Sequence, residues 1–217
     1  MSLDEYRRKR DFTTTPEPAA VARRRRQRRG VPYFCVQKHL ASHLHYDLRL
    51  ELGGALLSWA VPKRPSLDPA VKRLAMRTED HPLEYGDFEG VIPEGYGAGI
   101  VMLWNYGTWT AQTDDVNAAL ARGDLKLTLD GYKLKGLWAL VRTHGSARPG
   151  ERADGQSWLL IKHRDEWSGA LDITTFAPHS VKSEGDFEHI LAANVPAVWV
   201  TNRPARSGAQ TRKAGHK

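Results

Sequence analysis

The sequence predicts an all-β protein: a compact β-barrel with a central polar cleft, one or two short helices and flexible basic termini. Short segments rich in Val, Leu, Tyr, Phe and Trp recur between turn residues, as they do in barrels and sandwiches. The composition, with 41% hydrophobic and 26% charged residues, is that of a globular protein. We divide the 217 residues into a basic N-terminal arm (1–30), the barrel (31–167) and a C-terminal extension with a basic tail (168–217).

Eight segments have the residue types and the bounding turns of β-strands. They are 33–39, 44–52, 55–61, 73–80, 99–111, 124–131, 135–144 and 157–166. Gly53 and Gly54 indicate a hairpin turn, and residues 130–136 indicate another. Residues 114–124 combine an Asp cap, helix formers and a terminal glycine, which predicts a helix, and residues 187–194 predict a second short one. Residues 13–32 have no periodicity and predict a flexible loop.

Positive charge is concentrated at the two ends of the chain. Residues 1–30 contain ten lysine or arginine residues against four acidic ones, and residues 201–217 contain five against none. The arginine-rich run 23–29 therefore predicts an arm that can follow a phosphate backbone, and the alternative is a solvated arm without a partner.

Several classes of protein are excluded by simple counts. The start of the chain is too polar for a signal peptide, and no apolar run approaches the roughly 20 residues of a membrane-spanning helix. We therefore expect a cytoplasmic protein without a membrane partner. The single cysteine, Cys35, excludes an internal disulfide framework and a zinc site with several thiolates.

Polar residues gather on one face of three predicted strands. Because successive side chains of a strand point to opposite sides, segment 44–52 has an apolar face and an ionisable face. The ionisable face carries His45, Asp47, Arg49 and Glu51. Gln37 and His39 share one face of the preceding strand, and the same alternation groups Arg73, Arg77, Glu79 and His81. We expect these faces to line one cleft, and the alternative is that each faces water.

Three of these residues have the chemistry of a metal site. His39, His45 and Asp47 are spaced as H-x5-H-x-D across a predicted hairpin. Two imidazoles and a carboxylate suit Mn, Fe, Zn or Co and leave coordination positions open. His43 lies in the predicted turn, where we expect a surface residue.

Cationic side chains are expected around this metal site. They are Arg49 on the same face, Arg73 and His81 from another segment, and Lys63 from a turn. Guanidinium groups match phosphate oxygens with two parallel hydrogen bonds, so a metal beside several cations predicts a bound phosphoryl group. Alternatively, Lys63 is an exposed turn lysine and Arg73 pairs with Glu79.

Four blocks of the sequence together carry a family resemblance. They are QKHLASHLHYDLRLE (37–51), LLSWAVPKRPSLDPAVKRLAM (56–76), EDHPLEYGDFEGVIPEG (79–95) and SWLLIKHRDEW (157–167). In this order they resemble the 3′-phosphoesterase domain of bacterial and archaeal DNA ligase D, which works in nonhomologous end joining with Ku. The resemblance covers about residues 6–167, and the fold that it implies is also a compact β-barrel with a central polar cleft.

The resemblance implies roles for individual residues. It implies that His39, His45 and Asp47 hold Mn²⁺, with Co²⁺ or Zn²⁺ as other metals of this kind. It implies that Arg49 and His81 contact the scissile phosphate, and it places around them Gln37, Lys63, Arg73, Glu79 and Tyr85. The N-terminal residues implied to reach back over the site are Arg10, Asp11 and Glu17, in segment 10–17.

The activity that the resemblance implies is the healing of DNA 3′ ends. A phosphodiesterase step removes a terminal 3′ ribonucleoside from a DNA or RNA/DNA primer–template, and a phosphomonoesterase step removes the remaining 3′-phosphate. His81, with a pKa near neutrality, would donate a proton to the leaving oxygen or brace the transition state. The implied partners are DNA ligase, polymerase/primase and Ku, at the nucleoid.

The chain departs from the family in two respects. The family usually reads IPEG-x-YGAG-T-V, whereas this chain reads IPEGYGAGIV and lacks one residue before Tyr96, so no role is carried over to 94–99. Neither a ligase nucleotidyl motif nor a polymerase domain is present in the sequence, which predicts a free-standing phosphoesterase.

Two other functions stay open on the residues alone. His45, Asp47 and His81 also match the two-histidine, one-carboxylate set of Fe(II) oxygenases. A non-catalytic adaptor that binds nucleic acid through basic tails would need only salt-sensitive affinity.

Overall fold

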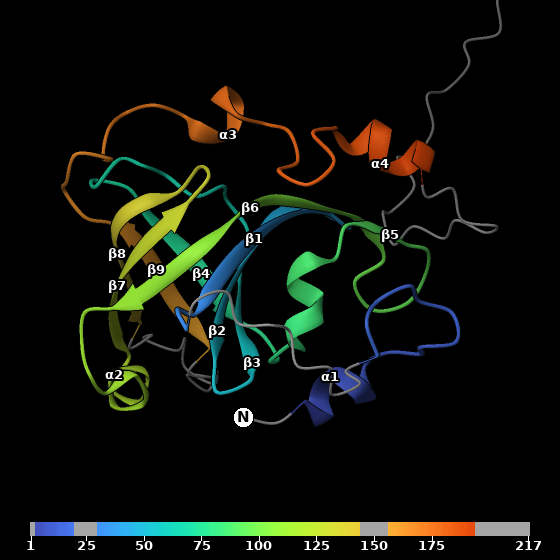
Figure 1. Ribbon diagram of the computed structural model, residues 1–217, viewed down its shortest axis with the longest axis horizontal. Helices are drawn as coiled ribbons and strands as arrows, with labels where there is room; N and C mark the ends of the chain where they lie inside the picture. The colour runs from blue at the N-terminus through green and yellow to red at the C-terminus, as the bar shows by residue number, and fades with distance from the viewer. Residues whose placement is uncertain (1–2, 20–29, 144–155, 194–217) are drawn as a thin grey trace, which may run out of the picture.

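The computed structural model describes residues 3–19, 30–143 and 156–193. Eight antiparallel strands close into a barrel in the order β1-β2-β3-β4-β9-β8-β7-β6, and β6 pairs back onto β1 (Figure 1). A short ninth strand, β5, pairs with the beginning of β6. The predicted all-β barrel is confirmed.

Each of the eight predicted segments overlaps a strand. The strands are β1 (Tyr33–Leu40), β2 (Leu44–Leu52), β3 (Ala55–Val61), β4 (Lys72–Arg77), β5 (Gly90–Ile92), β6 (Gly99–Ala111), β7 (Asp124–Gly131), β8 (Lys135–Arg142) and β9 (Ser157–Lys162). The helices are α1 (Asp4–Arg8), the 3₁₀ helix η1 (Leu83–Asp87), α2 (Val116–Arg122), α3 (Ile173–Phe176) and α4 (Phe187–Ala193). The sequence predicted α2 and α4 but not α1, η1, α3 or β5.

The inside of the barrel is filled with apolar side chains from all eight strands. Trp59, Trp104 and Trp138 are among its fully buried members. Tyr46, Leu48 and Leu50 of β2 point into this core, so the ionisable residues between them point outward. The polar face therefore lies on the outside of the barrel wall and not in the barrel interior.

The prediction that segment 73–81 continues the polar face is wrong for its first part, β4. Arg73 pairs across the sheet with Leu160, and Ala75 pairs with Trp158. Because both partners belong to the barrel core, this face of β4 points inward. The strand ends at Arg77, and the chain continues along the same edge of β3, where Thr78 N donates to Ser58 O and His81 forms an isolated bridge with Leu56.

A second, smaller apolar cluster covers the outer face of the wall. Tyr6 of α1, Leu56 of β3 and Tyr85 of η1 form its buried centre. The N-terminal segment and η1 are therefore held against the side of the barrel that carries the polar residues, and Figure 1 shows α1 outside the barrel.

The C-terminal segment packs on another part of the barrel. Ile173 of α3 and Ile190 of α4 join the main core cluster. No helix among residues 3–19, 30–143 and 156–193 has the length and apolarity needed to cross a bilayer. The basic runs 23–29 and 201–217, predicted to be flexible, lie outside the described residues.

Candidate active site on the outer barrel wall

The hairpin formed by β1 and β2 brings the three predicted metal ligands together. His39 lies directly opposite His45, and Asp47 lies opposite Gln37 in the same register. Because paired residues of an antiparallel sheet share a face, all four side chains lie on the outer side of the wall. The two pairs are two residues apart on each strand, and the tight turn after Leu40 sets their common register.

The ligand atoms of His39, His45 and Asp47 all lie within 4.8 Å of one another. His39 Nδ1 is 3.8 Å from Asp47 Oδ2, and His45 Nε2 is 3.6 Å from Asp47 Oδ1. The other ring nitrogens face backbone carbonyls, since His39 Nε2 is 2.9 Å from Gly97 O and His45 Nδ1 is 3.0 Å from His43 O. A carbonyl oxygen accepts a hydrogen bond from the ring N–H beside it, which leaves the other ring nitrogen of each histidine unprotonated and free for a metal. The three residues can therefore hold a metal ion.

Asp47 is held in its ionised form. Burial alone would raise the pKa of its carboxyl, but Arg49, His39 and His45 together lower the pKa well below its usual range. The carboxylate is therefore available as a metal ligand at neutral pH.

Arg49 is fixed by three side-chain acceptors. Its Nε donates to Gln37 Oε1 at 2.7 Å, its Nη1 to Ser58 Oγ at 2.8 Å and its Nη2 to Asp47 Oδ2 at 3.2 Å. Gln37 in turn donates to the carbonyls of Tyr85 and Phe88, which ties the arginine to η1. Arg49 is thus oriented toward the metal ligands with little freedom to move.

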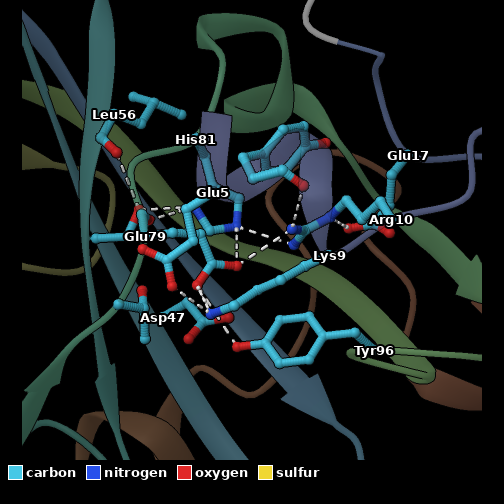
Figure 2. A network of polar contacts seen from close by, with 12 residues as sticks. Glu5, Lys9, Arg10, Glu17, Asp47, Leu56, Glu79, His81 and Tyr96 are labelled. Atoms are coloured by element: carbon cyan, nitrogen blue, oxygen red, sulfur yellow. Dashed lines mark hydrogen bonds and ion pairs between the residues drawn. The ribbon is translucent and has the colours of Figure 1, made fainter. Parts of the chain in front are cut away.

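A second arginine comes from the N-terminal segment. Arg10 donates to Glu17 Oε1 at 2.7 Å, to Glu79 Oε1 at 3.1 Å and to His81 Nε2 at 3.2 Å, as Figure 2 shows. Lys9 donates to the other oxygen of Glu79 at 3.1 Å. The N-terminal segment is thereby joined by ion pairs to residues beyond β4.

His81 is a neutral imidazole in this arrangement. Its pKa is held well below the usual value of 6.5 by burial and then by the charges of Arg49 and Arg10. Since Arg10 donates to Nε2, the ring proton lies on Nδ1, which faces Glu79 O at 2.9 Å. The expected pKa near neutrality is wrong, and His81 carries no extra proton to give to a leaving oxygen.

These residues surround one pocket with a volume of about 230 Å³. Its lining includes the three metal ligands and, around them, Arg10, Glu17, Arg49, Glu79, His81, Tyr85 and Tyr96. Gln37 lies immediately behind Arg49 and is fully buried. Burial, followed by the charge of Glu17, raises the pKa of Tyr85 well above its usual value, so its hydroxyl is neutral.

Comparison with known proteins identifies the family. Residues 37–142 match the model of the DNA ligase D 3′-phosphoesterase domain. The chain belongs to this family. It is 49% identical over 210 residues to the multifunctional non-homologous end joining protein LigD of Pseudomonas aeruginosa. The aligned segment covers 95% of this chain and 24% of the relative. It is 44% identical over 146 residues to the LigD repair protein of Mycobacterium tuberculosis, covering 66% of this chain and 18% of the relative. The chain thus spans about a quarter or less of these relatives.

Three of the residues predicted for the phosphoesterase site lie elsewhere. Asp11 is exposed and accepts hydrogen bonds from Thr13 in a surface turn. Lys63 and Arg73 line a second hollow, together with Lys38 and Arg64. The two hollows lie on opposite faces of β2, since His45 and Asp47 line the first, whereas Leu44 and Tyr46 line the second.

The oxygenase set of His45, Asp47 and His81 is not assembled. Among the described residues, the group able to hold a metal contains His39 and not His81. His81 Nε2 instead faces the guanidinium of Arg10, whose positive charge opposes metal binding at that nitrogen.

Sequence reasoning missed several residues of the site. Ser58 supports Arg49, Lys9 pairs with Glu79, and Tyr96 lines the pocket. Ser58 follows from the alternation of β3, because it lies opposite Arg49. No local pattern places Lys9, since its partner is 70 residues away in the chain.

Proposed function

We propose that this chain is a metal-dependent DNA 3′-end-healing phosphoesterase. It removes a 3′-terminal ribonucleoside and then the 3′-phosphate, and leaves a 3′-hydroxyl for repair. The observation that carries the proposal is the placement of His39, His45 and Asp47 in one pocket with the fixed guanidinium of Arg49. The family match supports the same reaction class.

The metal that we propose is Mn²⁺, with Co²⁺ or Zn²⁺ as alternatives. Two imidazole nitrogens and one carboxylate suit these ions and leave positions open for water and a phosphoryl oxygen. When bound, such an ion polarises the phosphoryl group and lowers the pKa of a coordinated water.

The surrounding side chains bind and orient the phosphate. Arg49 donates to the nonbridging oxygens, where charge grows in the transition state. Its three acceptors hold it in place before substrate binds. The Tyr85 hydroxyl offers a hydrogen bond to the same group, and Arg10, which donates to the neutral His81, adds positive charge at the pocket wall.

The second hollow extends the proposal to the rest of the nucleic acid. Lys63 and Arg73 lie with Lys38 and Arg64 around this hollow, on the opposite face of β2 from the first pocket. Such a group of cations suits a neighbouring backbone phosphate of the DNA or RNA/DNA primer–template. We further propose that the protein acts with the ligase, polymerase/primase and Ku proteins of end joining, at the nucleoid.

The test is a labelled primer–template that ends in one 3′ ribonucleotide, incubated with and without Mn²⁺. We expect stepwise conversion to a 3′-phosphate and then to a 3′-hydroxyl, only in the presence of the metal. Unchanged primer under all metal conditions would overturn the proposed function. Incubation with Fe(II) and a 2-oxo acid, assayed for CO₂, is expected to give no product and separates the reaction from that of an oxygenase.

A further inference from the structure

Tyr96 differs from the other tyrosine of the pocket lining. Tyr85 is 2% exposed, whereas Tyr96 is 50% exposed although it lines the same pocket. A half-exposed aromatic ring at the edge of a polar pocket offers a flat apolar surface to a ligand with an aromatic face.

The ring is held at the pocket edge by charged neighbours. Lys9 Nζ lies 4.8 Å from the ring centroid, and the Tyr96 hydroxyl lies 3.5 Å from Glu79 Oε2. Figure 2 shows the hydroxyl directed toward Lys9 and Glu79. Partial burial, followed by the charge of Glu79, raises the pKa of Tyr96, so that the ring is a neutral phenol.

The loop that carries Tyr96 is also joined to the metal ligands. Gly95 and Gly97 flank it with φ angles of +82° and +80°, a left-handed conformation that glycine adopts without strain. The carbonyl of Gly97 faces Nε2 of His39 at 2.9 Å. The ring therefore lies at a fixed place relative to the ligand set.

We propose that Tyr96 stacks against the base of the nucleotide whose 3′ oxygen carries the phosphate. This inference rests on the proposed function and names the part of the substrate that the pocket edge recognises. Every base has a π face, so stacking on a tyrosine favours nucleic-acid ends of any sequence over phosphoesters that lack a base. Tyr96 is then a positioning residue that places the terminal phosphate over the metal ligands and Arg49.

The test compares Tyr96→Ala and Tyr96→Phe on two primers with a 3′-phosphate, one with a normal terminal nucleotide and one whose terminal nucleotide lacks its base. Loss of one stacked base commonly weakens binding by about tenfold or more. We expect Tyr96→Ala to raise KM about tenfold on the normal primer, to leave kcat nearly unchanged and to have no effect on KM for the abasic primer. Tyr96→Phe keeps the ring and is expected to behave as wild type on both. Tyr132→Ala is the matched control, because Tyr132 is 67% exposed and is not part of the pocket lining.

Three results would overturn the inference. They are an unchanged KM for Tyr96→Ala, an equal rise in KM on both primers, and a Tyr96→Phe variant as impaired as Tyr96→Ala. Equilibrium binding of the same primers, measured by fluorescence anisotropy without added metal, separates this test from that of the proposed function. If the wild type releases no phosphate, the proposed function fails, whereas in the binding assay stacking is overturned if Tyr96→Ala binds the normal end as tightly as wild type does.

Discussion

Side-chain direction decides the chemistry of this protein at the scale of single residues. Asp47 and Arg49 point outward from β2, while Leu48 between them lies in the barrel core. A shift of one residue in register would bury the two charges in the core and expose the leucine. The same strand thus supplies both the core and the site, and the site depends on the register of the β1–β2 hairpin.

Three side-chain hydrogen bonds restrict the position of the Arg49 guanidinium. Replacement by lysine keeps the charge, but the N–H donors of lysine share one nitrogen. They cannot reach Gln37, Ser58 and Asp47 together, as the three nitrogens of the guanidinium do. We expect Arg49→Lys to lower kcat for 3′-phosphate release by on the order of 10²–10³-fold at saturating Mn²⁺, the usual cost of losing a donor to a transition-state oxyanion. Arg142→Lys, on β8, is the matched control and is expected to keep the wild-type kcat. Wild-type turnover in Arg49→Lys would contradict the role proposed for the guanidinium.

Because the pKa of His81 is depressed, we expect the free energy of unfolding to depend on pH. Its pKa in the folded protein is depressed, so the unfolded state binds more protons once the pH falls below about 6.5. The free energy of unfolding should therefore decrease as the pH falls through this value, by up to about 1.4 kcal/mol per pH unit for one group. In urea unfolding without metal, we expect wild type to lose more stability than His81→Gln between pH 7.5 and pH 5.5. Equal losses in the two proteins would show that His81 titrates normally in the folded state.

At the scale of elements, the strands were predictable because their alternation is local. The segments 44–52, 55–61, 99–111 and 124–131 form strands with those bounds. The face of β4 that points into the barrel was not predictable. Arg73 and Arg77 indicate a polar face, although Ala75 between them on the same face is a core residue. A short strand with two arginines and one alanine carries too little apolar pattern to show which face is inside.

The site was partly predictable for the same reason. His39, His45 and Asp47 are close in sequence, so the hairpin alone brings them together. The contacts of Arg10 with Glu79 and His81 join residues 69 and 71 positions apart, and only the packing of α1 on the outer wall creates them. Lys63 and Arg73 were predicted beside the metal ligands, but both line the second hollow. The sequence did not show that Arg73 lies on the inward face of β4.

Replacement of Gly107 tests how closely β6 and β7 approach each other. A Cβ on Gly107 would lie 2.1 Å from the backbone oxygen of Asp130. Since a backbone atom cannot move aside as a side chain can, we expect Gly107→Ala to cost about 1–3 kcal/mol or more of folding free energy. For a domain of this size that corresponds to a fall in Tm of roughly 2–4 °C per kcal/mol.

The matched control for this substitution is Gly169→Ala, because a Cβ there meets nothing within 4 Å. It should change Tm little. A Gly107→Ala protein that melts with the wild type would mean that the two strands are further apart than the structure has them.

At the scale of the whole molecule, the barrel and its N-terminal segment have separate apolar clusters. Residues 3–19 contribute Tyr6 to the outer cluster and no buried member to the main core. The barrel should therefore fold without them, whereas the pocket would lose Arg10 and Glu17.

A truncation of residues 1–19 tests this division. We expect the shortened protein to keep the near-ultraviolet circular dichroism of its buried tryptophans, to melt a few degrees lower because Leu56 and Tyr85 become exposed, and to lose at least tenfold in 3′-phosphate release. Trp138→Ala, a core variant, should instead cost about 3–5 kcal/mol. An unfolded truncated protein, or one with full activity, would contradict the division.

We infer that the β1–β2 hairpin forms a metal site on the outside of the barrel. A titration of Mn²⁺ into the protein, followed by electron paramagnetic resonance, tests this for wild type, Asp47→Asn and the control Asp130→Asn, whose side chain is exposed on β7. We expect tight binding of one ion by wild type and control, loss of this binding in Asp47→Asn, and a parallel loss of 3′-phosphate release. An Asp47→Asn protein that binds Mn²⁺ and releases phosphate as the wild type does would contradict it.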